Sequence, residues 1–189
     1  SAVQDTLTKK VRANPNITYL VHDNQLYALT KGQTSPTSEH DFATPSTPQG
    51  APETPLNPIA LALAAGCGFV ARGFAGDVPH MKEIVKAALT YRGFALIDVF
   101  QPCVTFNHLN TYQYFFKRVV KLETLKHDPA DRDAAWQQAH SGPDHLPIGI
   151  FYQHERPTLD QHFALLKEKP LVQQPATARQ LDALLKKFA

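Results

Sequence analysis

Residues 17–37 read ITYLVHDNQLYALTKGQTSPT, an apolar run followed by a long polar segment. The β-branched and apolar residues 17–21 predict a buried strand. In an open α/β sheet, ligands bind in the crevice beyond the carboxyl ends of the strands. Polar residues 23–25 follow the predicted strand directly, so residues 23–37 are a candidate ligand loop.

The side chains of this loop suit a hard cation that carries a phosphate group. Asn24 offers a carbonyl oxygen and the main chain of Leu26 offers another, and Mg²⁺ prefers a few protein oxygens completed by phosphate and water. Lys31 could meet an anion and Gly32 permits close approach of the backbone. Hydroxyl groups could add to an anion site at Thr30, Thr34, Ser35 and Thr37. The alternative is a solvated turn capped by an Asx motif.

Strand and helix patterns alternate after this loop. The proline-rich residues 31–56 predict no regular element, and loops of this length are usually functional or disordered. Asn57-Pro58 is typical of a helix start, and the Ala-rich helix should stop at Gly66. The following elements should be a strand at 69–72, a helix from Asp77 to Gly93 and a central strand at 94–100. This order predicts a doubly wound, mostly parallel α/β sheet.

The helix expected after Asp77 has an apolar stripe at helical spacing, which predicts its core-facing side. The stripe consists of Val78, Met81, Ile84, Val85, Ala88 and Leu89. Met81 is therefore interpreted as core, and His80 as solvated on the other face. Cys67 precedes a predicted strand and is interpreted as core too. Cys103 follows strand 94–100, at the same sheet edge as Asn24, and is either structural or a metal ligand.

The ends of the chain give weaker patterns. Residues 1–14 predict a weakly amphipathic helix, and residues 176–189 predict another that docks on the body or a partner. The remaining elements expected are an aromatic helix from Asn110-Thr111 through Phe116, a strand at 119–122, a helix beginning at Asp128-Pro129 and carrying Trp136, and a strand at 147–152. Surface positions are expected for His127, His140, His145, His154 and His162, which lack metal spacing.

Composition restricts the class of protein. The 189 residues are 43% hydrophobic and 19% charged, as expected for one globular domain with or without appendages. A net charge of +2 gives no reason to expect a nucleic-acid partner. No apolar run approaches the roughly 20 residues of a membrane span, and no signal-peptide pattern opens the chain. A cytoplasmic location is the default expectation.

Several motifs in one order carry a resemblance to a known family. They are DNQLYALTKGQTSPT (23–37), TPSTP (44–48), NPIALAL (57–63), FVARG (69–73), QPCVTFN (101–107), PIGIFY (147–152) and ERPT (155–158). Together they resemble the β subunit of 2-oxoacid:ferredoxin oxidoreductases, over about residues 16–173. The Thr-Lys-Gly-Gln form at residues 30–33 is most similar to the 2-oxoglutarate or broad 2-oxoacid branch.

The resemblance implies a fold of the thiamine-pyrophosphate-binding type and assigns roles to residues. Asn24 and the Leu26 carbonyl would hold Mg²⁺ against the diphosphate, and Thr30, Gly32 and Gln33 would line the cofactor. Lys31 would lie near the substrate, and Cys103 would be one ligand of a [4Fe-4S] cluster in the complete subunit. The reaction implied is oxidative decarboxylation of a 2-oxoacid with coenzyme A, which gives acyl-CoA, CO₂ and reduced ferredoxin. The glutamate that activates the cofactor would belong to an α subunit with the pyrimidine-binding domain, so no catalytic acid is assigned here.

Two features of the family pattern are missing from these 189 residues. The family's metal-binding Gly-Asp-Gly turn does not occur, and no other grouped cysteines could share a cluster with Cys103. Either the chain is a fragment that begins after these motifs, which is the interpretation adopted, or it is a divergent member without them. We expect residues 1–125 to belong to the cofactor-binding domain and residues 126–189 to form an extension that packs on it or on a partner. The alternative function is a non-catalytic scaffold or assembly module of the same fold.

Overall fold

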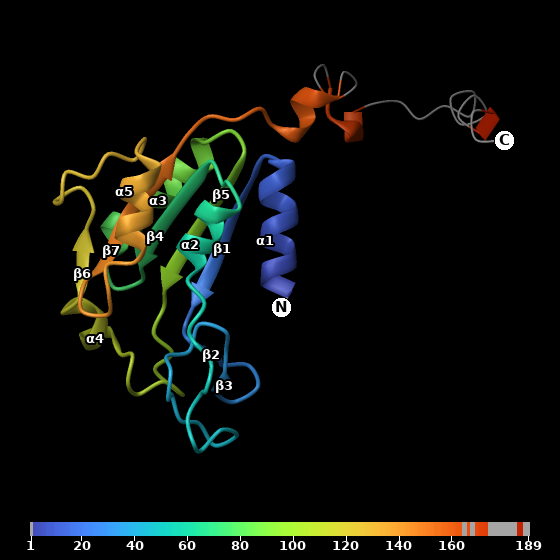
Figure 1. Cartoon of the computed structure of the whole chain (residues 1–189). Coiled ribbons are helices and arrows are strands. Elements are labelled where there is room, and N and C mark those ends of the chain that lie inside the picture. The colour runs from blue at the N-terminus through green and yellow to red at the C-terminus, as the bar shows by residue number, and fades with distance from the viewer. Residues whose placement is uncertain (1, 164–165, 167–168, 174–184, 187–189) are drawn as a thin grey trace.

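The described residues form a five-stranded sheet with helices on both faces (Figure 1). The computed structural model describes residues 2–163, 166, 169–173 and 185–186. The strand order is β1-β5-β4-β7-β6, in which β1, β5 and β4 are parallel and β7 runs antiparallel to β4. The bounds are β1 (Ile17–Asp23), β4 (Phe69–Phe74), β5 (Phe94–Phe100), β6 (Val119–Lys121) and β7 (Leu146–Gln153). The predicted doubly wound, mostly parallel sheet is confirmed.

Two groups of helices cover the sheet. One face packs against α1 (Ala2–Ala13), α2 (Pro58–Ala64) and α5 (Arg132–Ala139), and the other face packs against α3 (Val78–Thr90). The short helix α4 (Tyr112–Phe116) lies with the hairpin strands β2 (Leu26–Tyr27) and β3 (Gln33–Thr34) at the end of the molecule where β1 and β5 finish (Figure 1). Short 3₁₀ turns follow at Leu159–His162 and Leu171–Gln173.

Strand β5 shows why the sheet lies at the centre of the core. All seven of its residues are buried, as the continuous apolar run predicts for a central parallel strand. Because successive side chains of a strand point to opposite faces, Phe94 and Leu96 pack with α1, α2 and α5, and Ala95, Ile97 and Val99 pack with α3. Cys67 is 1% exposed in the first of these clusters, which confirms its assignment to the core.

The helix starts follow the predicted capping chemistry at α2 and α3. Asn57 Oδ1 accepts a hydrogen bond from Ala60 N at 3.1 Å, and Asp77 Oδ1 accepts one from His80 N at 3.2 Å. Pro58 and Pro79 stand in the first turns, where a missing N–H costs nothing. The sequence was misleading for α5, which begins at Arg132 with Asp131 as its cap and not at Asp128-Pro129.

Strand β1 is less buried than its composition predicts. Ile17 is 43% exposed and Leu20 is 38% exposed, so the expectation of a buried strand was wrong. The reason is its position, because β1 is an edge strand of the sheet and pairs only with β5 among the described residues.

Other expectations for individual residues are wrong, because contacts between distant segments determine which side chains are buried. His80 is not solvated, because its side chain is 11% exposed and its Nε2 lies 3.3 Å from Glu123 Oε1. Val78 and Leu89, placed on the apolar stripe, are 69% and 68% exposed, so the buried face of α3 is narrower than its sequence suggests. A two-residue hairpin strand, β3, occurs where no regular element was expected.

Residues beyond position 125 also contribute a strand to the sheet, and the structure describes the chain without gaps from residue 2 to residue 163. Strand β7 lies between β4 and β6, so residues 146–153 belong to the sheet. The helix predicted at 176–189 falls outside the described residues except at positions 185–186. The division at residue 125 stays a prediction. Within the described part of the chain, no helix has the length and apolar character that crossing a membrane requires.

Candidate functional site

The loop of residues 23–39, called the cofactor loop after the role that the resemblance implies, begins where β1 ends at Asp23. Leu26 N donates a hydrogen bond to Asn24 Oδ1 at 3.3 Å, so the Asx turn considered as the alternative is present. The turn places Gln25 in the left-handed region, with a φ of 59°. A carbonyl oxygen has two lone pairs, so Asn24 Oδ1 can accept this hydrogen bond and still bind a cation. The turn and the metal site are therefore compatible.

The tip of the β2–β3 hairpin is set by two successive left-handed residues. Lys31 has a φ of 74° and Gly32 a φ of 98°, and Gly32 N donates to Tyr27 O at 2.9 Å to close the turn. The Lys31 side chain is exposed. The hydroxyl group of Thr30 donates to Gln33 Oε1, so these two predicted cofactor residues contact each other.

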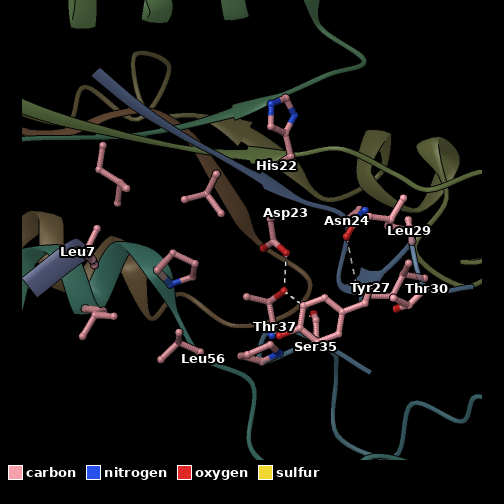
Figure 2. Close-up of a pocket in the computed structure, with 17 residues that line it drawn as sticks. Leu7, His22, Asp23, Asn24, Tyr27, Leu29, Thr30, Ser35, Thr37 and Leu56 are labelled. Atoms are coloured by element: carbon pink, nitrogen blue, oxygen red, sulfur yellow. Dashed lines mark hydrogen bonds between the residues drawn. The ribbon is translucent and has the colours of Figure 1, made fainter. Parts of the chain in front are cut away.

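A cavity of about 460 Å³ lies between the cofactor loop, β1 and the helices α1 and α2. Leu7 of α1 and Leu56 form one side of it in Figure 2, with Asn24 and Tyr27 on the other side. Asp23 projects into the middle, toward Thr37 (Figure 2). Most of the wall is apolar, and polar side chains line it at Asp23, Asn24, Thr30, Ser35 and Thr37, whereas the His22 ring points away from the cavity (Figure 2).

Asp23 is a buried carboxyl group that the sequence analysis did not single out. It is 6% exposed, and its Oδ1 accepts hydrogen bonds from Thr37 Oγ1 at 2.6 Å and from Gln25 N at 3.3 Å. Burial, together with the nearby carboxylate of Asp98, raises the pKa of Asp23 to about 7. The sequence analysis expected the Thr37 hydroxyl group to be available to an anion. In the structure this hydroxyl group donates its proton to Asp23 and so holds the loop to β1.

Behind Asp23 lies a buried ion pair between neighbouring strands. Arg72 Nε donates to Asp98 Oδ2 at 2.8 Å, and the side chains are 8% and 0% exposed. The guanidinium carbon of Arg72 lies 4.7 Å from the ring centre of Phe100 and 5.6 Å from that of Phe151. Burial raises the pKa of Asp98 against the opposing effect of Arg72. The sequence did contain a signal for this ion pair, because each of the two otherwise apolar strands includes one charged residue.

The structure brings Cys103 close to the cofactor loop. Cys103 is partly buried against Leu26, Phe42 and Ala51. Its main-chain oxygen accepts a hydrogen bond from Asn107 N at 2.9 Å, and Asn107 Nδ2 donates to Asn24 O at 3.4 Å. The predicted shared edge of Asn24 and Cys103 follows from β1 and β5 being parallel neighbours.

The side chains present fit part of a metal–diphosphate site. Asn24 and Leu26 provide neutral oxygen donors, a set that Mg²⁺ accepts when phosphate and water complete its shell. Among the described residues, no group of three or more His, Cys, Asp or Glu side chains could hold a metal ion by itself. Cys67 is 1% exposed in the core, and burial raises the pKa of its thiol to about 11, so Cys103 is the candidate cysteine ligand for a cluster at this edge.

Comparison with known proteins identifies the class. Residues 3–99, just over half of the chain, match the family described as "Thiamine pyrophosphate enzyme, C-terminal TPP binding domain". Residues 103–168 match the family that describes the C-terminal part of the pyruvate ferredoxin oxidoreductase beta subunit. The chain therefore belongs to the family of thiamine-pyrophosphate enzymes, through its C-terminal cofactor-binding domain.

Individual relatives narrow the class to one kind of subunit. The chain is 43% identical over 162 residues to the 2-oxoacid:ferredoxin oxidoreductase subunit beta of Saccharolobus solfataricus, a match that covers 76% of this chain and 50% of that protein. It is 45% identical over 101 residues to the 2-oxoglutarate oxidoreductase subunit KorB of Mycobacterium tuberculosis, covering 53% and 27% of the two chains. The resemblance to β subunits of 2-oxoacid:ferredoxin oxidoreductases is confirmed.

A solved structure agrees with these relatives. The 2-oxoglutarate:ferredoxin oxidoreductase from Magnetococcus marinus, solved with 2-oxoglutarate, coenzyme A and succinyl-CoA bound, matches with a TM-score of 0.83 and 35% identity. The match covers 96% of this chain and 62% of that one. The chain spans about half the length of the curated relatives from Saccharolobus and Sulfolobus.

Proposed function

We propose that this chain is the diphosphate-binding part of a β subunit that oxidises a 2-oxoacid, with 2-oxoglutarate as one candidate substrate. The overall reaction converts the 2-oxoacid and coenzyme A to acyl-CoA and CO₂ and passes the electrons to ferredoxin. An α subunit would complete the enzyme. The observation that carries the proposal is the Asn24–Leu26 turn at the carboxyl end of β1, within the stretch that matches the cofactor-binding family.

Each residue of the site has one task in this proposal. Asn24 Oδ1 and the Leu26 carbonyl would hold Mg²⁺, which binds the diphosphate of the cofactor. Lys31 would face the substrate, where its positive charge can bind a carboxylate of the 2-oxoacid. Bound thiamine pyrophosphate supplies the carbon nucleophile and the electron sink. The apolar walls of the neighbouring cavity would keep water away from the site.

Cys103 would serve the later transfer of electrons. Its position beside Leu26 brings a thiol group to the same edge of the sheet as the cofactor loop. We propose that it contributes one ligand to a [4Fe-4S] cluster whose remaining thiolates come from outside these 189 residues, since clusters are usually held by four.

Calorimetric titration with thiamine pyrophosphate tests the proposal. We expect the complete subunit with its partner to bind the cofactor when Mg²⁺ is present, and this chain alone to bind it weakly because its metal ligands are neutral. Asn24→Ala in the complete subunit should weaken binding by at least about tenfold, the scale seen when metal-site residues are removed. Asn16→Ala, the same change at the opposite end of β1, is the matched control and should leave binding unchanged.

The titration also separates the two candidate functions. Tight Mg²⁺-dependent binding by this chain alone would show that the loop of residues 23–39 suffices. Absence of binding by the complete subunit with its partner would contradict the enzymatic proposal and favour the non-catalytic assembly module. One observation favours that module: the Thr30 and Thr37 hydroxyl groups already donate hydrogen bonds within the loop or to β1.

A further inference from the structure

Two loops at the carboxyl edge of the sheet are joined by buried amide side chains. One is the cofactor loop, residues 23–39, and the other is the cysteine loop, residues 101–111, which contains Cys103. Asn107 and Asn110 of the cysteine loop are each 1% exposed. A buried amide group needs partners for its donors and its acceptor, because each unpaired polar group costs free energy. The hydrogen-bond partners of Asn107 and Asn110 therefore show which segments these two side chains hold together.

Asn107 contacts both loops at once. Its Oδ1 accepts hydrogen bonds from Leu109 N at 3.1 Å and Asn110 N at 2.9 Å, which shapes the cysteine loop. Its Nδ2 donates to Asn110 Oδ1 at 3.1 Å and to the main-chain oxygen of Asn24 at 3.4 Å. The acceptor side of this amide is thus local, whereas one of its donated bonds reaches across 83 residues of sequence.

The bond to Asn24 falls on a peptide group whose orientation matters. The carbonyl of Asn24 belongs to the peptide that leads into Gln25, which has the left-handed φ of 59°. A non-glycine residue in that region persists only where the surroundings hold it. This peptide also separates the two predicted metal ligands, the side chain of Asn24 and the carbonyl of Leu26. An anchor on it therefore restrains the start of the turn that carries both oxygens.

Two further contacts join the same loops. Glu39 Oε1 accepts from Asn110 Nδ2 at 2.8 Å and from Tyr114 Oη at 2.9 Å. Gly32 packs on the Phe106 side chain so closely that a Cβ at position 32 would lie 3.2 Å from Phe106 Cβ. The cofactor loop is therefore held to the cysteine loop at its start, at its hairpin tip and at its end.

We propose that Asn107 is a positioning residue, which orients the Mg²⁺–diphosphate oxygens of Asn24 and Leu26 by anchoring their turn on the cysteine loop. This inference rests on the proposed function, because it concerns the same metal site. In this arrangement Asn107 itself touches neither the metal nor the cofactor. Its side chain acts through the Asn24 peptide, and its main-chain N–H ties the same residue to Cys103 O.

A pair of matched substitutions tests the bonds that the Asn107 amide donates. In Asn107→Ser, the hydroxyl oxygen can still accept from the nearby N–H groups, but it ends one bond closer to the backbone and loses the donated bonds to Asn110 Oδ1 and Asn24 O. Asn57→Ser is the control, since Asn57 likewise accepts locally from Ala60 N and donates to a distant carbonyl, that of Ala139, at 2.7 Å. Serine keeps the helix cap there.

The measurement is the apparent Mg²⁺ affinity in the presence of thiamine pyrophosphate, by calorimetry, for the complete subunit with its partner. We expect Asn107→Ser to weaken this affinity by about 10- to 100-fold, the range for residues that orient metal ligands. Asn57→Ser should stay within about twofold of wild type. The thermal midpoint of each variant reports on the fold independently of the metal.

A second pair protects the test against a variant that does not fold. Glu39→Ala releases Asn110 and the end of the cofactor loop, and it should weaken Mg²⁺ binding in the same direction. Glu39→Gln keeps an oxygen that can accept from Asn110 and Tyr114, and it should restore the affinity. Wild-type Mg²⁺ affinity in both Asn107→Ser and Glu39→Ala would overturn the inference while leaving the proposed function standing. Failure of the wild-type complex to bind the cofactor would overturn both.

Discussion

Arg72 and Asp98 occupy paired positions on the parallel strands β4 and β5, where both side chains are buried. Removing two charges from water is costly, and a buried pair recovers that cost only through good geometry and further contacts. Here the guanidinium group lies against two aromatic rings, Phe100 and Phe151. One oxygen of Asp98, Oδ1, is buried without a hydrogen-bond partner among the described residues, so the carboxylate depends strongly on Arg72.

Replacement of Arg72 should therefore be costly and dependent on pH. We expect Arg72→Met to lower the free energy of unfolding by about 3–5 kcal/mol at neutral pH, because it leaves the Asp98 carboxylate buried and unpaired. Burial already raises the pKa of Asp98, and loss of the guanidinium group raises it further. The folded state then binds a proton that the unfolded state has released, so stability falls as the pH rises above the unfolded pKa.

Urea unfolding at about pH 5 and about pH 8 measures this effect. The deficit of Arg72→Met relative to wild type should be larger at the higher pH. The double variant Arg72→Met/Asp98→Leu removes the stranded carboxylate and should recover most of the stability. A single variant as stable as wild type at the higher pH would show that Asp98 does not depend on its partner.

At the level of a single element, the start of helix α3 combines an N-cap with an ion pair. Asp77 accepts from His80 N and lies 2.8 Å from Lys121 Nζ of β6. The hydrogen bond from Lys121 lowers the pKa of Asp77, and the bond from the helix N-terminus acts in the same direction. The ion pair between Asp77 and Lys121 thus ties the start of α3 to β6, the edge strand at the opposite end of the sheet from β1.

Asp77→Ala should lower the free energy of unfolding by about 1 kcal/mol near neutral pH, the usual cost of a lost N-cap. Because folding lowers the pKa of Asp77, its stabilising effect is complete above the unfolded pKa and is lost as the pH falls through the folded value. Thermal unfolding across this acid range should show the curves of the variant and wild type converging. Asp77→Asn keeps the cap but not the charge, and it should retain most of the stability at neutral pH.

Local signals predicted some elements well and misled on others. Helices α2 and α3 follow from a cap and a proline in the first turn, and strand β5 follows from a run that is apolar except for Asp98. Asp128-Pro129 has the same form as a helix start, but Asp128 Oδ1 accepts from Ala130 N in a turn and Asp131 makes the cap. Both are Asp residues with a nearby N–H to bind, so sequence could not rank them.

At the scale of the whole molecule, strand order is set by contacts between distant segments. Residues 17–21 have the composition of a central strand, yet β1 lies at the edge of the sheet. The meeting of Asn24 with the cysteine loop was predictable, since both follow parallel strands. Asn107, Asn110 and Glu39 were not, because their bonds join positions 71 to 83 residues apart.

The edge position of β1 predicts a behaviour of this chain in solution. An edge strand with exposed apolar side chains is a template for pairing with another chain. We expect Leu20→Lys to reduce self-association at high protein concentration while the chain still folds, because Leu20 is 38% exposed and a lysine can extend its charged group into the solvent. Sedimentation velocity over a concentration series measures the association.

A control on the adjacent strand separates the edge from the core. Leu96 of β5 is 0% exposed, so Leu96→Lys should prevent folding, not merely change association. Identical concentration dependence in wild type and Leu20→Lys would show that this edge does not mediate contacts between copies.

The close packing of Gly32 on Phe106 has a consequence for comparing and recombining related chains. Any side chain at position 32 would meet both an unfavourable backbone conformation and the ring at position 106. A side chain at position 32 should therefore be tolerated better where the residue at position 106 is smaller, and we expect the two positions to vary together across homologues. Grafting the β2–β3 hairpin from a relative is therefore expected to preserve this packing only when the cysteine loop is grafted with it.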